Sequence, residues 1–371
     1  MHTGTKRLKL SDKHPRFLIR QDRPLNMEPP LALLRQSFLT PQELFFVRNH
    51  GNIPEVDPSQ YRLRISGLVS EPQSLSLDAF QYKFPKRKVT AVIQCAGNRR
   101  DELIALKPIP GEVPWNAAAI GNAQWSGATL RDVLQSAGLN EQASHVAFTG
   151  LDDVIQNGSH SPYGGSIPLE RALADDVLLA YEMNGRPLSP EHGFPLRAAI
   201  PGYIGARSVK WLASITVQSE PSANYFQTRA YKLFPPDAPT PVDWATGVTL
   251  YETPVNSVIC APTAAAPVSA GPVFIKGYAI GAGGCRISQV EVSVGGGSRW
   301  EEADLFQKDD SGAWCFWEIE ADLAPGVCDI IVRATDTQGN AQPHDSRRIW
   351  NAKGYVNNSW HRVKLSVTPS P

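Results

Sequence analysis

The spacing of hydrophobic residues changes several times along the first two thirds of the chain. Residues 61–69 alternate between polar and apolar side chains, as a half-buried strand does. Residues 130–137 carry apolar side chains at helical spacing, and Gly138 follows as a candidate C-cap. Apolar runs predict further strands over 89–93, 146–149, 177–182, 194–200 and 209–217, and a short helix over 168–173. This mixture of strands and helices predicts an α+β fold.

The last third of the chain has a different pattern. A proline-rich segment over 233–241 leads into it, and beyond residue 250 no helical period is convincing. Because 371 residues are too many for one ordinary core, we expect two domains, residues 1–245 and 246–371. Short segments with a β pattern recur between turn signals over 255–260, 273–279, 289–294, 313–319 and 329–334. They predict an all-β, immunoglobulin-like sandwich for the second domain.

Composition and charge exclude several classes of partner. The 36 Lys and Arg residues balance 36 Asp and Glu residues, so the net charge gives no reason to expect binding to nucleic acid or a membrane. No run of 18 apolar residues could span a bilayer. Residues 1–40 are rich in proline and charge and are expected to form an extended arm on the surface. They show no secretory signal, which predicts a cytoplasmic protein if Met1 is native and a periplasmic one if a leader was removed.

The five cysteines do not form any C-x-x-C pair, which argues against a zinc ribbon or a thioredoxin motif. Their odd number leaves at least one free thiol. Four of them lie in the last third, where a disulfide stays open as an alternative. In a chain of this size we expect the thiols to be reduced.

Cys95 is the cysteine with the most informative surroundings. It follows the predicted strand over 89–93, and Gly97, Arg99 and Arg100 come directly after it. Cationic neighbours favour the thiolate, which is the nucleophilic and metal-binding form of cysteine. The pattern therefore indicates a reactive sulfur or a single soft metal ligand. A buried structural cysteine is the alternative, although two buried arginines beside it would be expensive.

Three further polar segments are candidates for anion binding. Arg48 and His50 follow an aromatic pair, and the segment over 191–210 combines His192, Arg197 and Lys210 with several glycines. Glycines let the backbone approach an anion closely, and Arg and Lys supply charge-assisted hydrogen bonds. A third polar segment covers 351–362. Each could equally be an ordinary polar loop, and the chain has no P-loop, G-x-G-x-x-G, H-E-x-x-H or G-x-S-x-G motif.

Taken together, the motifs resemble those of the sulfite oxidase family of molybdenum enzymes over about residues 44–367. The resemblance rests on Phe-Val-Arg-Asn-His at 46–50, Cys-Ala-Gly-Asn-Arg-Arg at 95–100, Tyr-Gly-Gly-Ser-Ile-Pro-Leu at 163–169, Leu-Ala-Tyr-Glu-Met-Asn-Gly at 179–185, His-Gly-Phe-Pro-Leu-Arg at 192–197, Pro-Gly-Tyr-Ile-Gly-Ala-Arg at 201–207, Val-Lys-Trp-Leu at 209–212 and Trp-His-Arg-Val at 360–363. It implies a mixed α+β molybdopterin domain followed by an immunoglobulin-like dimerisation domain, and hence a homodimer. It also implies that Cys95 is the protein ligand of molybdenum, for which a soft thiolate is suited.

The resemblance assigns the remaining site residues position by position. Tyr231, Arg48 and Arg100 are expected to be catalytic, and Trp115 and Lys353 are expected to join them in binding the substrate. Guanidinium groups suit sulfite because it is a dianion near neutral pH. The residues expected to hold the pterin and its phosphate are His50, Asp152, His192, Arg197, Arg207 and Lys210. The implied reaction is the oxidation of sulfite to sulfate by oxygen-atom transfer.

Lys353 departs from the family pattern, in which an arginine usually stands in an Asn-Leu-Arg-Gly segment. Lysine keeps the charge but loses the bidentate fork. This departure leaves a reductase of nitrate or another small oxo-anion as an alternative, and a binding protein that has lost activity is a third hypothesis. No haem or flavin segment is recognisable, so we expect electrons to pass to a separate acceptor such as a cytochrome.

Overall fold

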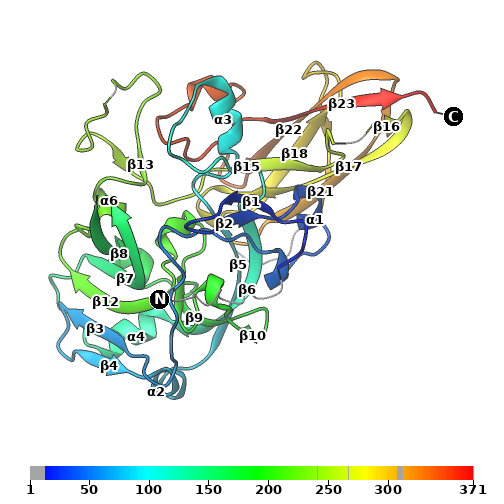
Figure 1. Ribbon diagram of the computed structural model, residues 1–371. Helices are drawn as coiled ribbons and strands as arrows, with labels where there is room; N and C mark the ends of the chain where they lie inside the picture. Colours follow the sequence, from blue (N-terminus) through cyan, green and yellow to red (C-terminus); the bar gives the residue numbers. More distant parts are fainter. Residues whose placement is uncertain (1–12, 157, 240, 266, 307–311, 371) are drawn as a thin grey trace, which may run out of the picture.

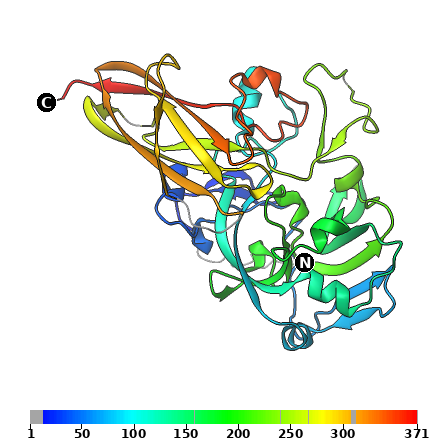
Figure 2. The same ribbon diagram turned by 180° about the vertical axis from the view of Figure 1, so that it is seen from behind.

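A computed structural model describes residues 13–156, 158–239, 241–265, 267–306 and 312–370. Figure 1 shows a mixed part, coloured light blue to green, beside a β-rich part, coloured yellow to red. Both views place the N-terminal strands β1 (Leu18–Gln21) and β2 (Asn26–Glu28) and helix α1 (Leu31–Leu34) against the junction of the two parts (Figures 1 and 2). No described helix is both long enough and apolar enough to cross a membrane. The predicted fold class is confirmed.

One antiparallel sheet of the mixed part leads directly to Cys95. Its strands run in the order β10 (Arg186–Pro187), β9 (Leu178–Met183), β6 (Ile120–Thr129) and β5 (Arg87–Gln94), and β11 (Arg197–Ala199) also pairs with β9. The last residues of β5 are buried, and Cys95 comes immediately after the strand. The Cys95 amide donates to the Ala119 carbonyl at 2.9 Å, which fixes the backbone at this point. The predicted strand before Cys95 is confirmed.

The second sheet of the mixed part brings an acidic residue toward the same region. Its strands run in the order β4 (Gln73–Leu75), β3 (Leu63–Gly67), β12 (Leu212–Gln218), β7 (His145–Gln156) and β8 (Ser159–Pro168), with β3 and β12 parallel. The predicted strand over 146–149 is too short. After Thr149 the register with β8 shifts and β7 continues to Gln156, and Asp152 is a buried residue in this extension.

Short helices connect these strands: α2 (Leu77–Lys83), α3 (Arg100–Leu106), α4 (Leu130–Ser136), α5 (Leu169–Ala172), α6 (Tyr225–Thr228) and the 3-10 turns η1 (Gln42–Leu44), η2 (Pro190–His192) and η3 (Gly205–Arg207). Thr129 caps α4 by accepting the Asp132 amide at 3.1 Å, and Gly138 follows the helix at φ +67°, where glycine is favoured. The predicted helix and its glycine cap are therefore confirmed.

The expectation of a surface arm over residues 1–40 is wrong for the part that the structure describes. Residues 1–12 lie outside the described residues. Glu28 is fully buried and accepts the Asn116 amide at 2.8 Å, and Leu34 packs in an apolar cluster with residues of both parts. The polar residues of this segment form hydrogen bonds with buried backbone groups. Composition alone does not distinguish such residues from those of an exposed arm.

The β-rich part consists of two packed sheets. One has the order β15 (Asn256–Ala261), β17 (Gly271–Ile280), β21 (Cys315–Leu323) and β20 (Asp304–Phe306); the other has β16 (Val268–Ser269), β23 (His361–Thr368), β22 (Gly326–Asp336), β18 (Ile287–Ser293) and β19 (Glu301–Glu302). Ile259, Trp317 and Ile330 lie in the buried cluster of this part. All five cysteines are free, as expected. The sequence pattern did not predict β23.

The two parts are joined by a hairpin and by side chains at their junction. β13 (Lys232–Leu233) pairs with β14 (Val248–Thr249) across the expected boundary, and the division at 245/246 stays a prediction. Two 3-10 turns complete the β-rich part, η4 (Ala282–Gly284) and η5 (Ser346–Arg348).

Arg99 in the loop after Cys95 donates to Asn256 Oδ1 at 2.7 Å and to the Ser359 carbonyl at 2.8 Å. The Cys95 loop is thereby held by both parts.

Candidate active site

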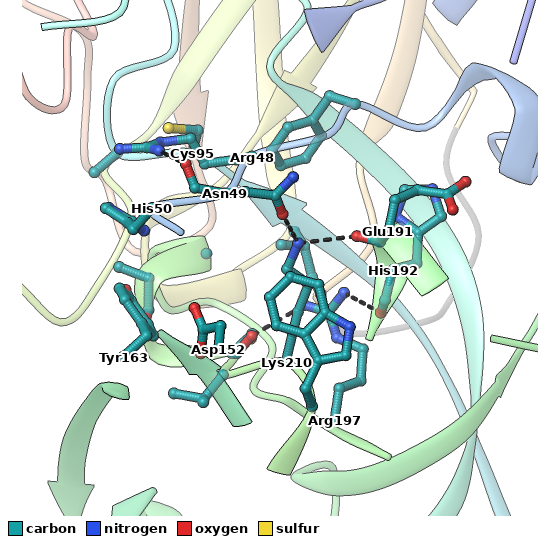
Figure 3. Close-up of a pocket in the computed structure, with 18 of the residues that line it drawn as sticks. Arg48, Asn49, His50, Cys95, Asp152, Tyr163, Glu191, His192, Arg197 and Lys210 are labelled. Carbon is teal, nitrogen blue, oxygen red and sulfur yellow. Dashed lines mark hydrogen bonds between the residues drawn. The ribbon is translucent and has the colours of Figure 1, made fainter. Parts of the chain in front are cut away.

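A cavity of about 660 Å³, counting the space at its open mouth, lies in the mixed part beside Cys95. Figure 3 shows most of its wall. The lining residues are Phe45, Phe46, Arg48, Asn49, His50, Ile93, Cys95, Ala96, Asp152, Tyr163, Glu191, His192, Arg197, Gly205, Ala206, Ser208, Val209, Lys210, Trp211 and Tyr231.

Cys95 and Arg48 lie together at one end of the cavity (Figure 3). The Gly97 amide donates a hydrogen bond to Cys95 Sγ at 3.4 Å. This hydrogen bond stabilises electron density on the sulfur atom. Arg48 donates to the Asn49 carbonyl and, at 3.3 Å, to Asn26 Oδ1. Burial disfavours the Arg48 charge, but the Tyr231 and Cys95 side chains outweigh this effect and raise its pKa. Arg48 is therefore a permanent cation beside the thiol.

Two further cations line the cavity away from Cys95. Lys210 donates to Asn49 Oδ1 and to the Glu191 carbonyl, the latter at 2.9 Å, and Arg197 donates to the His192 and Ser208 carbonyls at 3.0 Å (Figure 3). Burial lowers the pKa of Lys210 well below its usual range, and the Arg197 charge lowers it further. Burial alone lowers the pKa of Arg197 to about 9. An anionic ligand would relieve both effects, because it favours the charged forms.

Asp152 presents an unused acceptor to the cavity. Its Oδ1 is buried and has no hydrogen-bond partner among the described residues. Burial raises the pKa of Asp152 to about 6, although the Lys210 charge acts in the opposite direction. Buried polar atoms are nearly always paired in native proteins, so this oxygen indicates a ligand with a hydrogen-bond donor.

His192 is held by a residue of the N-terminal segment. Lys13 Nζ lies 2.7 Å from His192 Nε2, 3.0 Å from the Phe45 carbonyl and 3.6 Å from Glu191 Oε1. Burial lowers the pKa of Lys13 to about 8, and burial together with the Lys13 charge lowers the pKa of His192 well below its usual range. His192 is therefore neutral at pH 7.

Tyr231 forms a contact between the cavity and an aromatic cluster. Its hydroxyl lies 2.8 Å from His50 Nε2, and its backbone is held at φ +54°, an unusual conformation for a tyrosine. Burial raises the pKa of Tyr231 to about 12, while burial followed by the Arg48 charge lowers the pKa of His50. Both groups are neutral at pH 7, and one of them donates the hydrogen bond that joins them.

Eight of the residues expected from the sequence meet at this cavity: Arg48, His50, Cys95, Asp152, His192, Arg197, Lys210 and Tyr231. The pattern did not assign roles to other lining residues that stand within or beside the quoted motifs, namely Asn49, Tyr163, Glu191, Ser208 and Trp211. The signal that could have identified them is their polar or aromatic character next to residues with an assigned role.

Four expected residues do not line the cavity, and their roles stay predictions. Arg207 is buried against the Leu250 carbonyl and Gln227. Trp115 is fully buried, and its Nε1 has no hydrogen-bond partner among the described residues. Arg100 and Lys353 both form ion pairs with Glu112, which the sequence pattern did not single out.

Comparison with known proteins identifies the family. Residues 50–226 match the family model of the oxidoreductase molybdopterin binding domain, and residues 248–368 match that of the Mo-co oxidoreductase dimerisation domain. The sulfite oxidase of Gallus gallus is 44% identical to this chain, over 94% of this chain and 78% of its own length. The sulfite oxidase of Arabidopsis thaliana is 40% identical, over 96% and 95%.

The chain belongs to the sulfite oxidase family. It is thus a molybdopterin-dependent oxidoreductase, and the suspected resemblance is confirmed. The sulfane dehydrogenase SoxCD from Paracoccus pantotrophus has a similar solved structure, with a TM-score of 0.80 and 26% identity over 98% of this chain and 87% of that chain. An inducible NADH nitrate reductase of Glycine max is 37% identical, over 97% of this chain but only 42% of its own length.

The residues present fit the cofactor of this family. The cavity offers a lone thiol for a metal, the unpaired Asp152 oxygen for a donor on an organic ring, and Lys210 with Arg197 for an anionic group. The described residues contain no group of three His, Cys, Asp or Glu that could hold a metal ion by themselves. A molybdenum ion bound by Cys95 and a pterin dithiolene with a phosphate matches this set of groups in charge and in chemistry.

Proposed function

We propose that this protein oxidises sulfite to sulfate at a molybdopterin-bound molybdenum and passes the electrons to a separate acceptor such as a cytochrome. The observation that carries the proposal is the arrangement of Cys95, Arg48 and Tyr231 around one cavity whose remaining wall carries the basic side chains of Arg197 and Lys210. A soft ligand beside a permanent cation suits a redox metal that acts on a small anion.

Cys95 would bind the metal, while His50, Asp152, His192, Arg197 and Lys210 would hold the pterin and its phosphate. When bound, this group supplies the two-electron redox chemistry and the transfer of an oxygen atom. Arg207 is proposed to support the same ligand indirectly, by holding the loop that lines the cavity. It follows Gly205 and Ala206, which are lining residues.

The residues of the chain supply binding and orientation of the substrate. Arg48 keeps its charge because its pKa is raised, so it can hold an oxyanion at every pH at which the protein is folded. Tyr231 and His50 are neutral, and with His50 Nε2 donating to the Tyr231 oxygen, the Tyr231 hydroxyl can donate to an anionic oxygen near the metal. Arg100, Trp115 and Lys353 are proposed to shape the substrate's approach from outside the lining.

The same comparisons support a homodimer formed through residues 248–368, because that region matches a dimerisation domain. Sulfite is preferred to nitrate as substrate, because the two sulfite oxidases compared with this chain are more similar to it than the nitrate reductase is and match a larger share of their own length. The absence of haem and flavin, the cytochrome acceptor and the compartment stay predictions.

The function is tested by elemental analysis for molybdenum together with sulfite-dependent reduction of ferricyanide or cytochrome c. We expect turnover by the wild type and a loss of about 10³-fold in Cys95→Ser, because an oxygen ligand replaces the soft thiolate. Cys328→Ser is the matched control, since this thiol lies in β22 of the β-rich part and contacts the Val294 carbonyl. Full molybdenum occupancy without sulfite turnover, or with turnover of nitrate instead, would contradict the proposal.

A further inference from the structure

Glu112 forms ion pairs with Arg100 and Lys353, the two cationic residues outside the cavity lining for which the family resemblance predicts substrate binding. Lys353 Nζ lies 2.9 Å from Glu112 Oε1, and Arg100 Nη2 lies 3.4 Å from Glu112 Oε2. Each carboxylate oxygen therefore faces one cation. The Arg100 side chain is 2% exposed and that of Glu112 is 16% exposed, so solvent screens the Arg100 pair weakly. The three residues come from three separate segments: the start of α3, the loop before β6 and the loop before β23.

Glu112 does not hold Arg100 in place. Arg100 Nε donates to the Lys353 carbonyl at 2.9 Å and Nη1 donates to the Val113 carbonyl at 2.8 Å. A Cβ added at Gly97 would come within 2.6 Å of three guanidinium atoms, so the backbone also confines this group. The guanidinium is therefore positioned by main-chain groups, and the carboxylate acts on it chiefly through its charge.

This cluster lies one aromatic layer from the cavity. The Arg100 guanidinium is 5.3 Å from the centre of the Tyr355 ring, and Tyr355 stacks on Tyr231 with ring centres 5.1 Å apart. Tyr231 lines the cavity beside Arg48 and Cys95. Burial raises the pKa of Tyr355, and the Glu112 charge is the next largest cause, which places Glu112 within electrostatic reach of this wall.

The charges of these groups match a dianion. Arg48, Arg100 and Lys353 contribute three positive charges, and Glu112 contributes one negative charge. The sum is +2, opposite to the charge of sulfite and of sulfate. Without Glu112, three positive charges would act on both the substrate and the product without an opposing charge, and the product would be held more tightly.

We infer that Glu112 is a specificity-determining residue: its negative charge offsets the attraction that Arg100 and Lys353 exert on the bound oxyanion and so limits the affinity of the site for sulfate. This inference deepens the proposed function and rests on it for the identity of the substrate. Lys353 has a partly exposed side chain and four rotatable bonds, so it can turn from Glu112 toward an incoming anion.

The test compares the holoenzyme of the wild type with Glu112→Gln, Glu112→Asp and Glu291→Gln. Sulfate binding is measured by calorimetry, and the KM and kcat for sulfite are measured by ferricyanide reduction. We expect Glu112→Gln to bind sulfate about tenfold more tightly and to lower the KM by a similar factor, because one opposing charge is removed. Glu112→Asp keeps the charge and should stay within about twofold of the wild type.

Glu291→Gln is the matched control, because Glu291 forms an ion pair with Arg333 in the β-rich part and the change in net charge is the same. Sulfate should bind to it as to the wild type. Unchanged or weaker sulfate binding in folded Glu112→Gln would overturn the inference. Equal tightening in Glu291→Gln would also overturn it, since net charge would then explain the effect.

The outcomes separate this inference from the proposed function. A wild type that does not oxidise sulfite, combined with tighter sulfate binding in Glu112→Gln, would reject the function and support the anion site. A wild type that oxidises sulfite, combined with unchanged sulfate binding in the variant, would reject the inference alone. If Glu112→Gln does not fold, Glu112→Ala decides: we expect sulfate to bind more tightly than to the wild type, and wild-type or weaker binding would overturn the inference.

Discussion

The cavity wall and the β-sandwich use buried residues in opposite ways. Asp152, Glu191, His192 and Arg197 are all nine-tenths or more buried at the cavity. The cluster of buried side chains between the sandwich sheets is apolar, and the buried Asp336 of β22 accepts the Ala282, Gln338 and Asn340 amides at 3.0 Å. Arg333 and Glu291 form a partly exposed ion pair at 2.8 Å.

This difference indicates that the cavity wall, and not the sandwich, is arranged to bind a ligand. Burying a charge without a full set of partners is unfavourable. The lowered pKa of Lys210 and the raised pKa of Asp152 both result chiefly from this effect. Burying apolar area in the sandwich stabilises the fold without any ligand. Changes in the sandwich should therefore alter stability, and changes in the cavity wall should alter ligand retention.

The largest expected effect on stability is that of Ile330→Ala in the sandwich core. Ile330 is fully buried in β22, and truncation leaves a cavity that lowers the free energy of unfolding by about 3 kcal/mol. Urea denaturation followed by circular dichroism measures this loss. Molybdenum content per folded molecule should be unchanged. Loss of molybdenum from the variant while it is still folded would contradict the expectation that changes in the sandwich alter stability and not ligand retention.

The next effect concerns the pH dependence of cofactor-free protein, prepared in a host that cannot make the cofactor. Because the pKa of Asp152 is raised to about 6, the folded state binds more protons than the unfolded state between about pH 4 and pH 6. Stability should therefore fall as pH rises through this window, by about 2 kcal/mol from this group.

Urea denaturation at pH 4, 5 and 6 measures this slope in the wild type, in Asp152→Asn and in Asp322→Asn. The slope should be smaller in Asp152→Asn, which cannot ionise. Asp322 is exposed in β21 of the β-rich part, far along the chain from Asp152, so Asp322→Asn should keep the wild-type slope. Equal slopes in all three proteins would show that the buried Asp152 carboxyl does not oppose folding.

The smallest of the three effects is expected for Lys210→Met. Removing one cation from the proposed phosphate site should weaken cofactor retention about tenfold, the size of one charge-assisted hydrogen bond. Molybdenum content after gel filtration measures it, and Lys276→Met, at an ion pair on the sandwich, is the control. The cofactor-free variant should be at least as stable as the cofactor-free wild type. A less stable variant would show that Lys210 supports the fold rather than the ligand.

Much of the cavity could be predicted because its residues come from contiguous segments. His192 and Arg197 stand five positions apart around a tight turn, and Arg48 and His50 stand two apart in one loop. Their polar and cationic side chains marked these segments as candidates for anion binding, and the family resemblance then assigned the individual roles. The strand before Cys95 followed from a β-branched run in the same way.

Residues that depend on distant contacts could not be predicted. Lys13 reaches His192 although 179 positions separate them, and nothing in the proline-rich N-terminal segment indicates this contact. Asp152 was expected at the cofactor only from the family resemblance, because the pattern alone ended the strand at Thr149, before the register shift past which β7 continues. Glu112 gained significance only when folding placed it between Arg100 and Lys353.

The sequence by itself determined the mixed and β-rich parts, the thiol at a strand end and the cationic loops, because periodicity and short motifs act locally. Only the tertiary structure decided the roles of Arg99 and Arg100. Arg99 sits in the left-handed region at φ +64°, so its guanidinium turns to Asn256 and the Ser359 carbonyl of the β-rich part. Arg100 begins α3 and turns to a carbonyl 253 positions away. Adjacent residues of one type diverge because backbone conformation and long-range packing, which no local pattern encodes, direct each side chain.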